Sequence, residues 1–315
     1  MILEALVQFC QMLVVLALAP LLAGYVRKLK ALLVGRRGPP LSQPNRDLLR
    51  LLRKEVVLAH SASWVFRVTP YLVFAATWVG AALVPTFATG LLFSYAADMI
   101  AIVALLGSAR FMLALAGLDV GTSFGGIGSS REMMIASLAE PAMLMVVFTL
   151  SLLAGSTQLS SIAAFMQGGV GLRVSLALAL AGLIIVAIAE NGRIPVDNPA
   201  THLELTMVHE AMILEYSGRH LALIEAASYV KLLLYVSIIA CVFAPWGIAV
   251  SGQGIAAYLA GFGVYAGKLA LAGFLLAVFE TAIAKMRVFR YSDFLGAALM
   301  LGVLATLLRF VSRLT

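Results

Sequence analysis

Charged side chains are scarce in this chain of 315 residues: Lys, Arg, Asp and Glu together make up only 12% of it. An ordinary water-soluble domain carries about 25% of these residues. Hydrophobic residues account for 62% of the sequence. This shortage of charge excludes a soluble globular protein and indicates that lipid is the main solvent of the chain.

Cysteine is almost absent as well, since only Cys10 and Cys241 occur, both within apolar segments. Two cysteines exclude a disulfide framework and an Fe–S cluster bound by this chain alone. We therefore expect no cofactor on this chain. If the protein takes part in electron transfer, the redox groups belong to partner subunits.

The apolar runs are continuous rather than alternating, so they predict helices and not the strands of a membrane barrel. Each is close to the ~20 residues that a helix needs to cross the hydrocarbon core. The sequence therefore predicts an all-α polytopic protein with about eight transmembrane helices, forming one membrane domain over residues 1–315. The first run lacks a basic segment before it, so we expect it to be retained and not cleaved as a signal peptide. The expected spans are Ala5–Val26, Val68–Pro85, Leu91–Leu118, Met133–Ala154, Val174–Ala189, Leu221–Phe243, Ile255–Phe279 and Phe294–Leu308.

Basic residues gather on one side of this topology. The connections on that side contain 16 Lys and Arg, whereas the opposite connections and the tail contain three. The positive-inside rule makes the rich side cytoplasmic and puts both termini outside, in a plasma (inner) membrane protein. The net charge of +7 reflects this asymmetry, so we do not expect nucleic-acid binding.

The two longest cytoplasmic connections differ in character. Residues 27–67 form an amphipathic loop whose leucines at 48–52 oppose Arg46, Arg50 and Arg53, a pattern typical of a helix on the membrane surface. Residues 190–220 form an acidic loop. The outer connections are short and nearly uncharged, so we expect the functional surface to face the cytoplasm.

Ionisable side chains recur inside the apolar spans, where each is costly and therefore a functional candidate. Burial disfavours the charged form of both carboxylates and amines, which lets them exchange protons at working pH. One interpretation is a proton path; the alternative is pairing between helices or snorkelling to the interface, which we favour for Arg110 and Arg173. Lys231 also lies in a span. The proposed path consists of Asp98, Glu140, Glu190, Glu225, Lys268 and Glu280.

No metal or hydrolase motif is complete. His209-Glu210 begins like a zinc-protease signature, but position 213 is Ile where the second histidine is needed. The Gly-rich segment 121–128 has neither a dinucleotide-binding nor a phosphate-binding pattern. We expect no metal site and no catalytic residue.

Residues 190–197 (ENGRIPVD), followed by 215–218 (EYSG), resemble the quinone-chamber membrane subunit of complex I, which is called subunit 1 in mitochondria. They are still more similar to the homologous subunit of formate hydrogenlyase and related energy-converting NiFe hydrogenases. Further similar segments occur in the family's order at 37–39 (RGP), 52–55 (LRKE), 117–122 (GLDVGT), 130–132 (SRE) and 287–291 (RVFRY).

This resemblance implies a subunit without its own catalytic metal, docked beneath a hydrophilic arm. That arm would contain large and small redox subunits with Fe–S clusters and, in hydrogenases, a NiFe centre; antiporter-like membrane subunits would lie alongside. Residues 198–209 replace a more acidic stretch of complex I, which favours the hydrogenase-like branch and leaves the use of a quinone open. The residues implied to face the arm or a quinone chamber are Arg37, Asp47, Arg131, Arg193, Asp197, Glu204, Glu210, Glu215, Arg287, Arg290 and Asp293.

Three functions remain in competition. The first is coupling of electron transfer to proton translocation, the second is a passive membrane anchor, and the third is a quinone-binding subunit of an NADH:quinone oxidoreductase. A stand-alone transporter is less favoured because we find no clear internal repeat.

Overall fold

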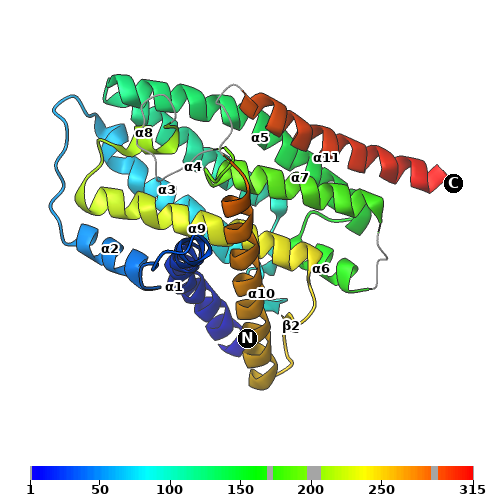
Figure 1. Ribbon diagram of the computed structural model, residues 1–315. Helices are drawn as coiled ribbons and strands as arrows, with labels where there is room; N and C mark the ends of the chain where they lie inside the picture. Colours follow the sequence, from blue (N-terminus) through cyan, green and yellow to red (C-terminus); the bar gives the residue numbers. More distant parts are fainter. Residues whose placement is uncertain (1, 169–172, 197–206, 285–289, 315) are drawn as a thin grey trace.

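The computed structural model describes residues 2–168, 173–196, 207–284 and 290–314, and helices form nearly all of its regular structure (Figure 1). Seven of the described helices are long and apolar enough to cross a membrane, and α7 is a shorter apolar helix. The predicted all-α fold is therefore confirmed. The helices are α1 (Ile2–Leu33), α2 (Gln43–Leu52), α3 (Trp64–Leu83), α4 (Met99–Asp119), α5 (Ser123–Ala154), α6 (Leu159–Gln167), α7 (Val174–Glu190), α8 (His209–Ile213), α9 (Gly218–Phe243), α10 (Ile255–Ala282) and α11 (Tyr291–Leu314).

Several helices extend beyond the apolar runs that predict them. The 32 residues of α5 span about 48 Å at 1.5 Å per residue, well beyond a ~30 Å hydrocarbon core. The helix begins where the Thr122 side chain accepts a hydrogen bond from the amide of Gly125. Arg131 and Glu132 end the apolar run but do not break the helix. Hydropathy therefore detects only the apolar part of α5.

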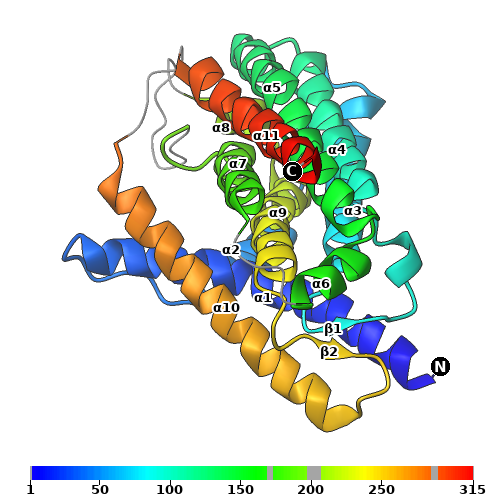
Figure 2. The same cartoon turned by 90° about the vertical axis from the view of Figure 1, so that its right-hand side faces the viewer.

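The long helices form two groups (Figures 1 and 2). In the larger group, α3 packs between α4 and α9, α5 packs on α4, and α11 packs against both α5 and α7. The other two, α1 and α10, contact each other and are inclined to the rest, with α1 also packed on α9. This arrangement leaves α9 between the two groups.

The connections opposite the basic side are tied by a very short sheet. The strands β1 (Ala88–Thr89) and β2 (Ala249–Val250) pair in parallel, and they join the loop after α3 to the loop after α9. A short 3-10 helix, η1 (Ser94–Ala96), leads from this sheet into α4. These small elements are too short to be predicted from hydrophobic pattern.

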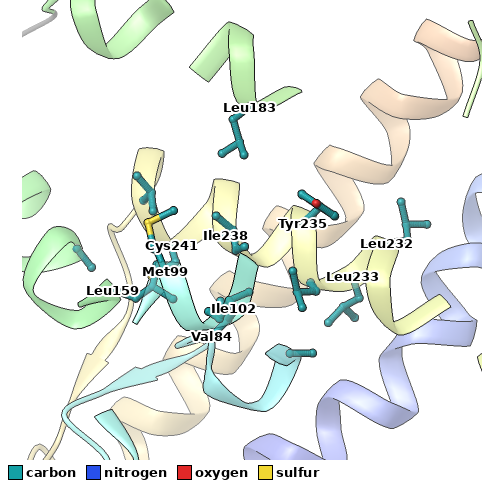
Figure 3. Packing of buried hydrophobic residues seen from close by; sticks show 14 of the residues in the cluster. Val84, Met99, Ile102, Leu159, Leu183, Leu232, Leu233, Tyr235, Ile238 and Cys241 are labelled. Atoms are coloured by element: carbon teal, nitrogen blue, oxygen red, sulfur yellow. The ribbon is translucent and has the colours of Figure 1, made fainter. Parts of the chain in front are cut away.

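The largest hydrophobic core surrounds α9, and part of it appears in Figure 3. Leu233 and Ile238 of α9 are fully buried and belong to one cluster with Ile102 of α4 and Leu183 of α7. Leu159 at the start of α6 is also fully buried there, which explains why this helix folds back onto α9. The core fixes α9, and with it the ionisable residues that α9 contributes.

Glycines allow α4, α5 and α8 to approach closely. A Cβ atom on Gly128 of α5 would lie 3.0 Å from the side chains of Ala211 and Met212 and from the carbonyl oxygen of Val208. One residue later, the Ser129 hydroxyl donates a hydrogen bond of 2.8 Å to the carbonyl of Ala114 in α4. Small residues at such contacts are typical of membrane helix interfaces.

Replacing Gly128 with Val should therefore lower the thermal stability of the protein in detergent, because overpacking of this kind costs about 1–3 kcal/mol. Gly126 provides the matched control, since it lies in the same helix with open space around its Cα. Thermal unfolding midpoints of Gly128→Val and Gly126→Val test this. Equal midpoints for the two variants would contradict the close crossing.

Candidate functional site

A cavity of about 510 Å³ lies among α1, α3, α4, α5, α7, α8 and α9. Its wall contains an unusual number of ionisable residues for a protein with so few of them. The polar part contrasts with an apolar part formed by residues such as Val73, Leu106 and Leu113. The ionisable lining consists of Arg27, Lys30, Arg110, Arg193 and Lys231, with Glu132, Glu190, Glu210, Glu225 and His209.

Arg110 is the centre of the largest group of charges. Its Nε lies 3.3 Å from a carboxylate oxygen of Glu132, its Nη1 lies 3.7 Å from Glu140, and its Nη2 contacts Glu190. The side chain of Arg110 is only 5% exposed. One guanidinium is thus paired with carboxylates from both α5 and α7, although its buried Nε and Nη1 atoms make no hydrogen bond to any described residue.

Lys231 of α9 supplies a second cation, with Nζ 4.0 Å from the other carboxylate oxygen of Glu190. This central cluster of Arg110, Lys231, Glu132, Glu140 and Glu190 therefore has two cations and three carboxylates. With every group ionised, it has one uncompensated negative charge. A single exchangeable proton would balance it.

A second cluster joins the ends of α1, α7 and α10. Glu280 is buried and lies 2.6 Å from Nζ of Lys30 and 3.5 Å from Nη1 of Arg193. Burial lowers the pKa of the Arg193 guanidinium, and the negative charge of Glu280 counters that effect. This cluster carries two cations for one carboxylate, so it complements the negative central cluster across the cavity.

Glu225 belongs to the cavity through Tyr229, one turn further along α9. The Tyr229 hydroxyl accepts a hydrogen bond of 3.3 Å from Arg27, and the carboxylate of Glu225 lies close enough to act on it electrostatically. The guanidinium of Arg27 also lies over the tyrosine ring at 5.5 Å from its centroid. Glu225 is therefore held at the wall of the cavity without a direct salt bridge to the central cluster.

Glu140 differs from the other carboxylates of this cluster because 43% of its side chain is exposed. A Cβ atom on Gly107 of α4 would lie 3.3 Å from its Oε1, so the carboxylate rests over this glycine. Glu140 is 17 residues into α5, or about 26 Å from the helix start. It is thus far from both ends of the helix.

Two residues of the predicted path lie elsewhere. Asp98 caps α4, where its side chain accepts hydrogen bonds from the amide of Ile100 at 2.7 Å and from the hydroxyl of Thr157. Lys268 of α10 donates to the carbonyls of Ala244 at 2.5 Å and Trp246 at 2.7 Å, at the end of α9. These contacts are those of a helix N-cap and a helix C-terminus. The structure therefore separates Asp98 and Lys268 from Glu140, Glu190, Glu225 and Glu280.

The predicted loop residues are also divided. Glu210 and Arg193 line the cavity, and Arg131 donates from Nη1 to the carbonyl of Met207 at 2.7 Å. Asp47 accepts hydrogen bonds from Gln43 and Arg50 within α2. The exposed members are Arg37, Glu215, Arg290 and Asp293. Asp197, Glu204 and Arg287 lie outside the described residues.

The segment 215–218, one of those that carry the family resemblance, fixes a loop. Tyr216 stacks on Phe66 with ring centroids 3.9 Å apart, and its hydroxyl donates to the Phe66 carbonyl at 3.1 Å. Burial, with a smaller contribution from Asp119, raises the pKa of Tyr216, so this donor stays protonated. The Ser217 side chain bonds both the amide and the carbonyl of Val57.

Gly218 completes this fixed contact. Its φ of +52° lies in the left-handed region, and its Cα faces the backbone of Lys54 and Glu55 too closely to leave room for a side chain. The similar segments at 52–55 and 215–218 therefore meet in space. Their pairing holds the start of α9 against the loop between α2 and α3.

A family model described as NADH dehydrogenase matches residues 6–311 of the chain. The chain belongs to this family. The predicted relationship to the complex I membrane subunit and to its hydrogenase counterparts is confirmed.

Individual relatives support this membership. The chain is 33% identical over 282 residues to formate hydrogenlyase subunit 4 of Escherichia coli (strain K12), covering 88% of this chain and 89% of the relative. It is 34% identical over 239 residues to hydrogenase-4 component C of the same organism, covering 76% and 75%. A chain in the archaeal respiratory complex called membrane-bound sulfane sulfur reductase has the same fold, with a TM-score of 0.80 at 18% identity and coverage of 95% and 98%.

Sequence reasoning missed part of the site. The pairing expected for Arg110 is present, but the sequence does not show that this one residue joins three carboxylates. Glu132 enters the sequence analysis only as part of the similar segment 130–132, and Lys30 only as a basic residue of the connection 27–67. The available signal for Arg110 was its isolation in an apolar run, whereas Glu132 and Lys30 lie next to other charged residues. Within the described part of the chain, no three His, Cys, Asp or Glu side chains gather as a metal site.

Tyr216→Phe should destabilise the protein by about 1 kcal/mol, because the buried carbonyl of Phe66 then loses its donor. Tyr71→Phe is a suitable control, since Tyr71 is 46% exposed. Thermal unfolding of both variants in detergent measures the difference. A loss of stability in the control as large as in Tyr216→Phe would argue against the assigned hydrogen bond.

Proposed function

We propose that this chain is the membrane subunit of a hydrogenase-like or complex I-like respiratory complex, where it anchors the redox arm and couples electron transfer to proton translocation. The observation that carries this proposal is the ionic connection between the cavity and Glu140 through Arg110. A row of charges that reaches from a cavity to an exposed carboxylate within an apolar helix is costly to maintain. Proton transfer is a function that accounts for retaining these charges despite their energetic cost.

The path begins at the cavity, whose volume and ionisable lining suit water molecules. Glu210 and Glu225 receive protons there, and Glu132 and Glu190 carry them into the central cluster. Glu140 is the outlet, because it is the half-exposed member. In this scheme, Asp98 and Lys268 stabilise helix ends and take no part in proton transfer.

The proposed partners follow from what this chain lacks. Cys10 is exposed on α1 and Cys241 is buried in α9, so the pair offers no Fe–S site. Large and small redox subunits with Fe–S clusters, and a NiFe centre in a hydrogenase, would dock on the cytoplasmic loops. The exposed residues Arg37, Glu215, Arg290 and Asp293 suit such a contact.

Antiporter-like subunits would receive protons within the inner membrane. In the proposed orientation both termini lie outside, and the cavity opens toward the basic, cytoplasmic side. Glu140 then faces sideways, in the plane of the bilayer. A neighbouring membrane subunit on this face would remove the carboxylate from lipid.

Two observations favour other functions. Because many of the buried charges are paired, the chain could be a passive anchor whose ion pairs only fix the packing of its helices. The cavity also has an apolar wall beside donors from Arg27 and Tyr229, which fits a quinone headgroup of modest size. Under that reading, Tyr229→Phe would weaken reduction of an added water-soluble quinone by the purified complex; unchanged kinetics would exclude Tyr229 as its donor.

Glu140→Gln and Glu225→Gln test coupling. In the assembled complex, each should abolish or strongly reduce proton translocation while redox turnover with artificial acceptors persists, because a carboxamide does not act as an acid or base at working pH. Translocation is measured in inverted vesicles with a pH-sensitive dye, alongside the amount of intact complex.

Asp98→Asn is the control, because the amide oxygen can still cap α4. It should translocate protons normally. If Glu140→Gln and Glu225→Gln also translocate protons normally in normally assembled complexes, the proposed proton path is wrong. If they lower assembly without altering translocation per turnover, the passive anchor explains these residues.

A further inference from the structure

Arg110 stands between the two ends of the proposed path. Glu132 and Glu190 line the cavity, whereas Glu140 is not among its lining residues and has 43% of its side chain exposed, and the guanidinium is paired with all three. Its own side chain is 5% exposed. A proton that leaves the cavity for Glu140 must therefore pass a buried positive charge.

That charge is permanent, because a guanidinium does not release its proton in proteins. In a medium of low dielectric constant, a fixed cation strongly repels a second positive charge at contact distance. Membrane channels exclude protons and cations in this manner, with an arginine placed on the path. At rest, the charge of Arg110 opposes free passage from the cavity to Glu140.

The three carboxylates compete for this one cation unequally. Nη2 contacts Glu190 most closely, Nε lies 3.3 Å from Glu132, and Nη1 lies 3.7 Å from Glu140. Lys231, at 4.0 Å from Glu190, is the other cation of the cluster. If Glu190 takes up a proton, its attraction for Arg110 falls, and the guanidinium can move toward Glu140.

We propose that Arg110 is the positioning residue that gates this path. It blocks proton leakage when Glu190 is ionised and shifts between the cavity carboxylates and Glu140 when Glu190 is neutralised. The gate rests on the proposed function, since it has meaning only if protons pass through Glu140. If Arg110 only paired with carboxylates, its role would be structural; the gate gives it a role in proton transfer as well.

A neighbouring glycine allows Glu140 to be displaced without changing Arg110. Gly107 lies three residues before Arg110 in α4, and the carboxylate of Glu140 rests over it. A side chain at position 107 would displace Glu140 and leave the charge of Arg110 in place. The charge and the outlet can therefore be altered separately.

The decisive experiment uses the whole complex in sealed proteoliposomes without redox substrates. A potassium diffusion potential drives protons inward, and an internal dye reports the passive rate. Arg110→Gln should raise this rate on the order of tenfold or more, because the repulsive charge is lost. Arg110→Lys should stay near the wild-type rate because it keeps the charge, but its redox-driven translocation should fall, because one ammonium cannot bridge three carboxylates.

Two further variants define the result. Lys268→Gln removes a cation of α10 that lies outside the path, and it should leave passive proton flow unchanged. Gly107→Leu should reduce redox-driven translocation without raising the leak. If Arg110→Gln fails to assemble, the passive proton rate and the redox-driven translocation of Gly107→Leu and Arg110→Lys still test the gate.

The outcomes separate the gate from the path. The gate is overturned if Arg110→Gln shows no higher passive proton rate than the wild type and translocates normally per electron. A raised passive proton rate in Gly107→Leu also overturns it. If Glu140→Gln translocates normally, the path itself is wrong. If Glu140→Gln blocks translocation while Arg110→Gln remains tight, protons pass through Glu140 but Arg110 does not control them.

Discussion

The interior of this protein depends on the contacts of a single guanidinium with three carboxylates. Arg110 alone would be an uncompensated charge within an apolar helix, and Glu132, Glu140 and Glu190 would repel one another without it. Together they are tolerated, because attraction at low dielectric offsets part of the cost of removing them from water. The positions of α4, α5 and α7 are constrained by this shared requirement.

The surrounding fold supplies the required distances. Close glycine contacts bring α4 and α5 together at Gly117 and Gly125, and Leu233 and Ile238 of α9 share one hydrophobic core with residues of α4 and α7. At the ends of α1, α7 and α10, the Glu280 cluster carries the excess of positive charge that the central cluster lacks. The charges of these two clusters are therefore opposite in sign.

Much of the fold could be predicted from the sequence, because uninterrupted apolar runs have few structural solutions in a membrane. The start of α5 at Ser123 and the position of Asp98 could not, because hydropathy marks the lipid boundary and not the cap of a helix. The candidate site was only partly predictable for a different reason. Which charges meet depends on the rotation and crossing of helices, so Lys268 and Glu280, both in α10, have unlike surroundings.

The fixed contact at Gly218 has a mechanical consequence. Ser217 binds the backbone of Val57, and from there α9 runs for 26 residues as one rigid rod of about 39 Å. Glu225, Tyr229 and Lys231 are all carried on that rod. A protein docked on the loop between α2 and α3 would therefore contact the end of the same continuous helix that carries these interior charges.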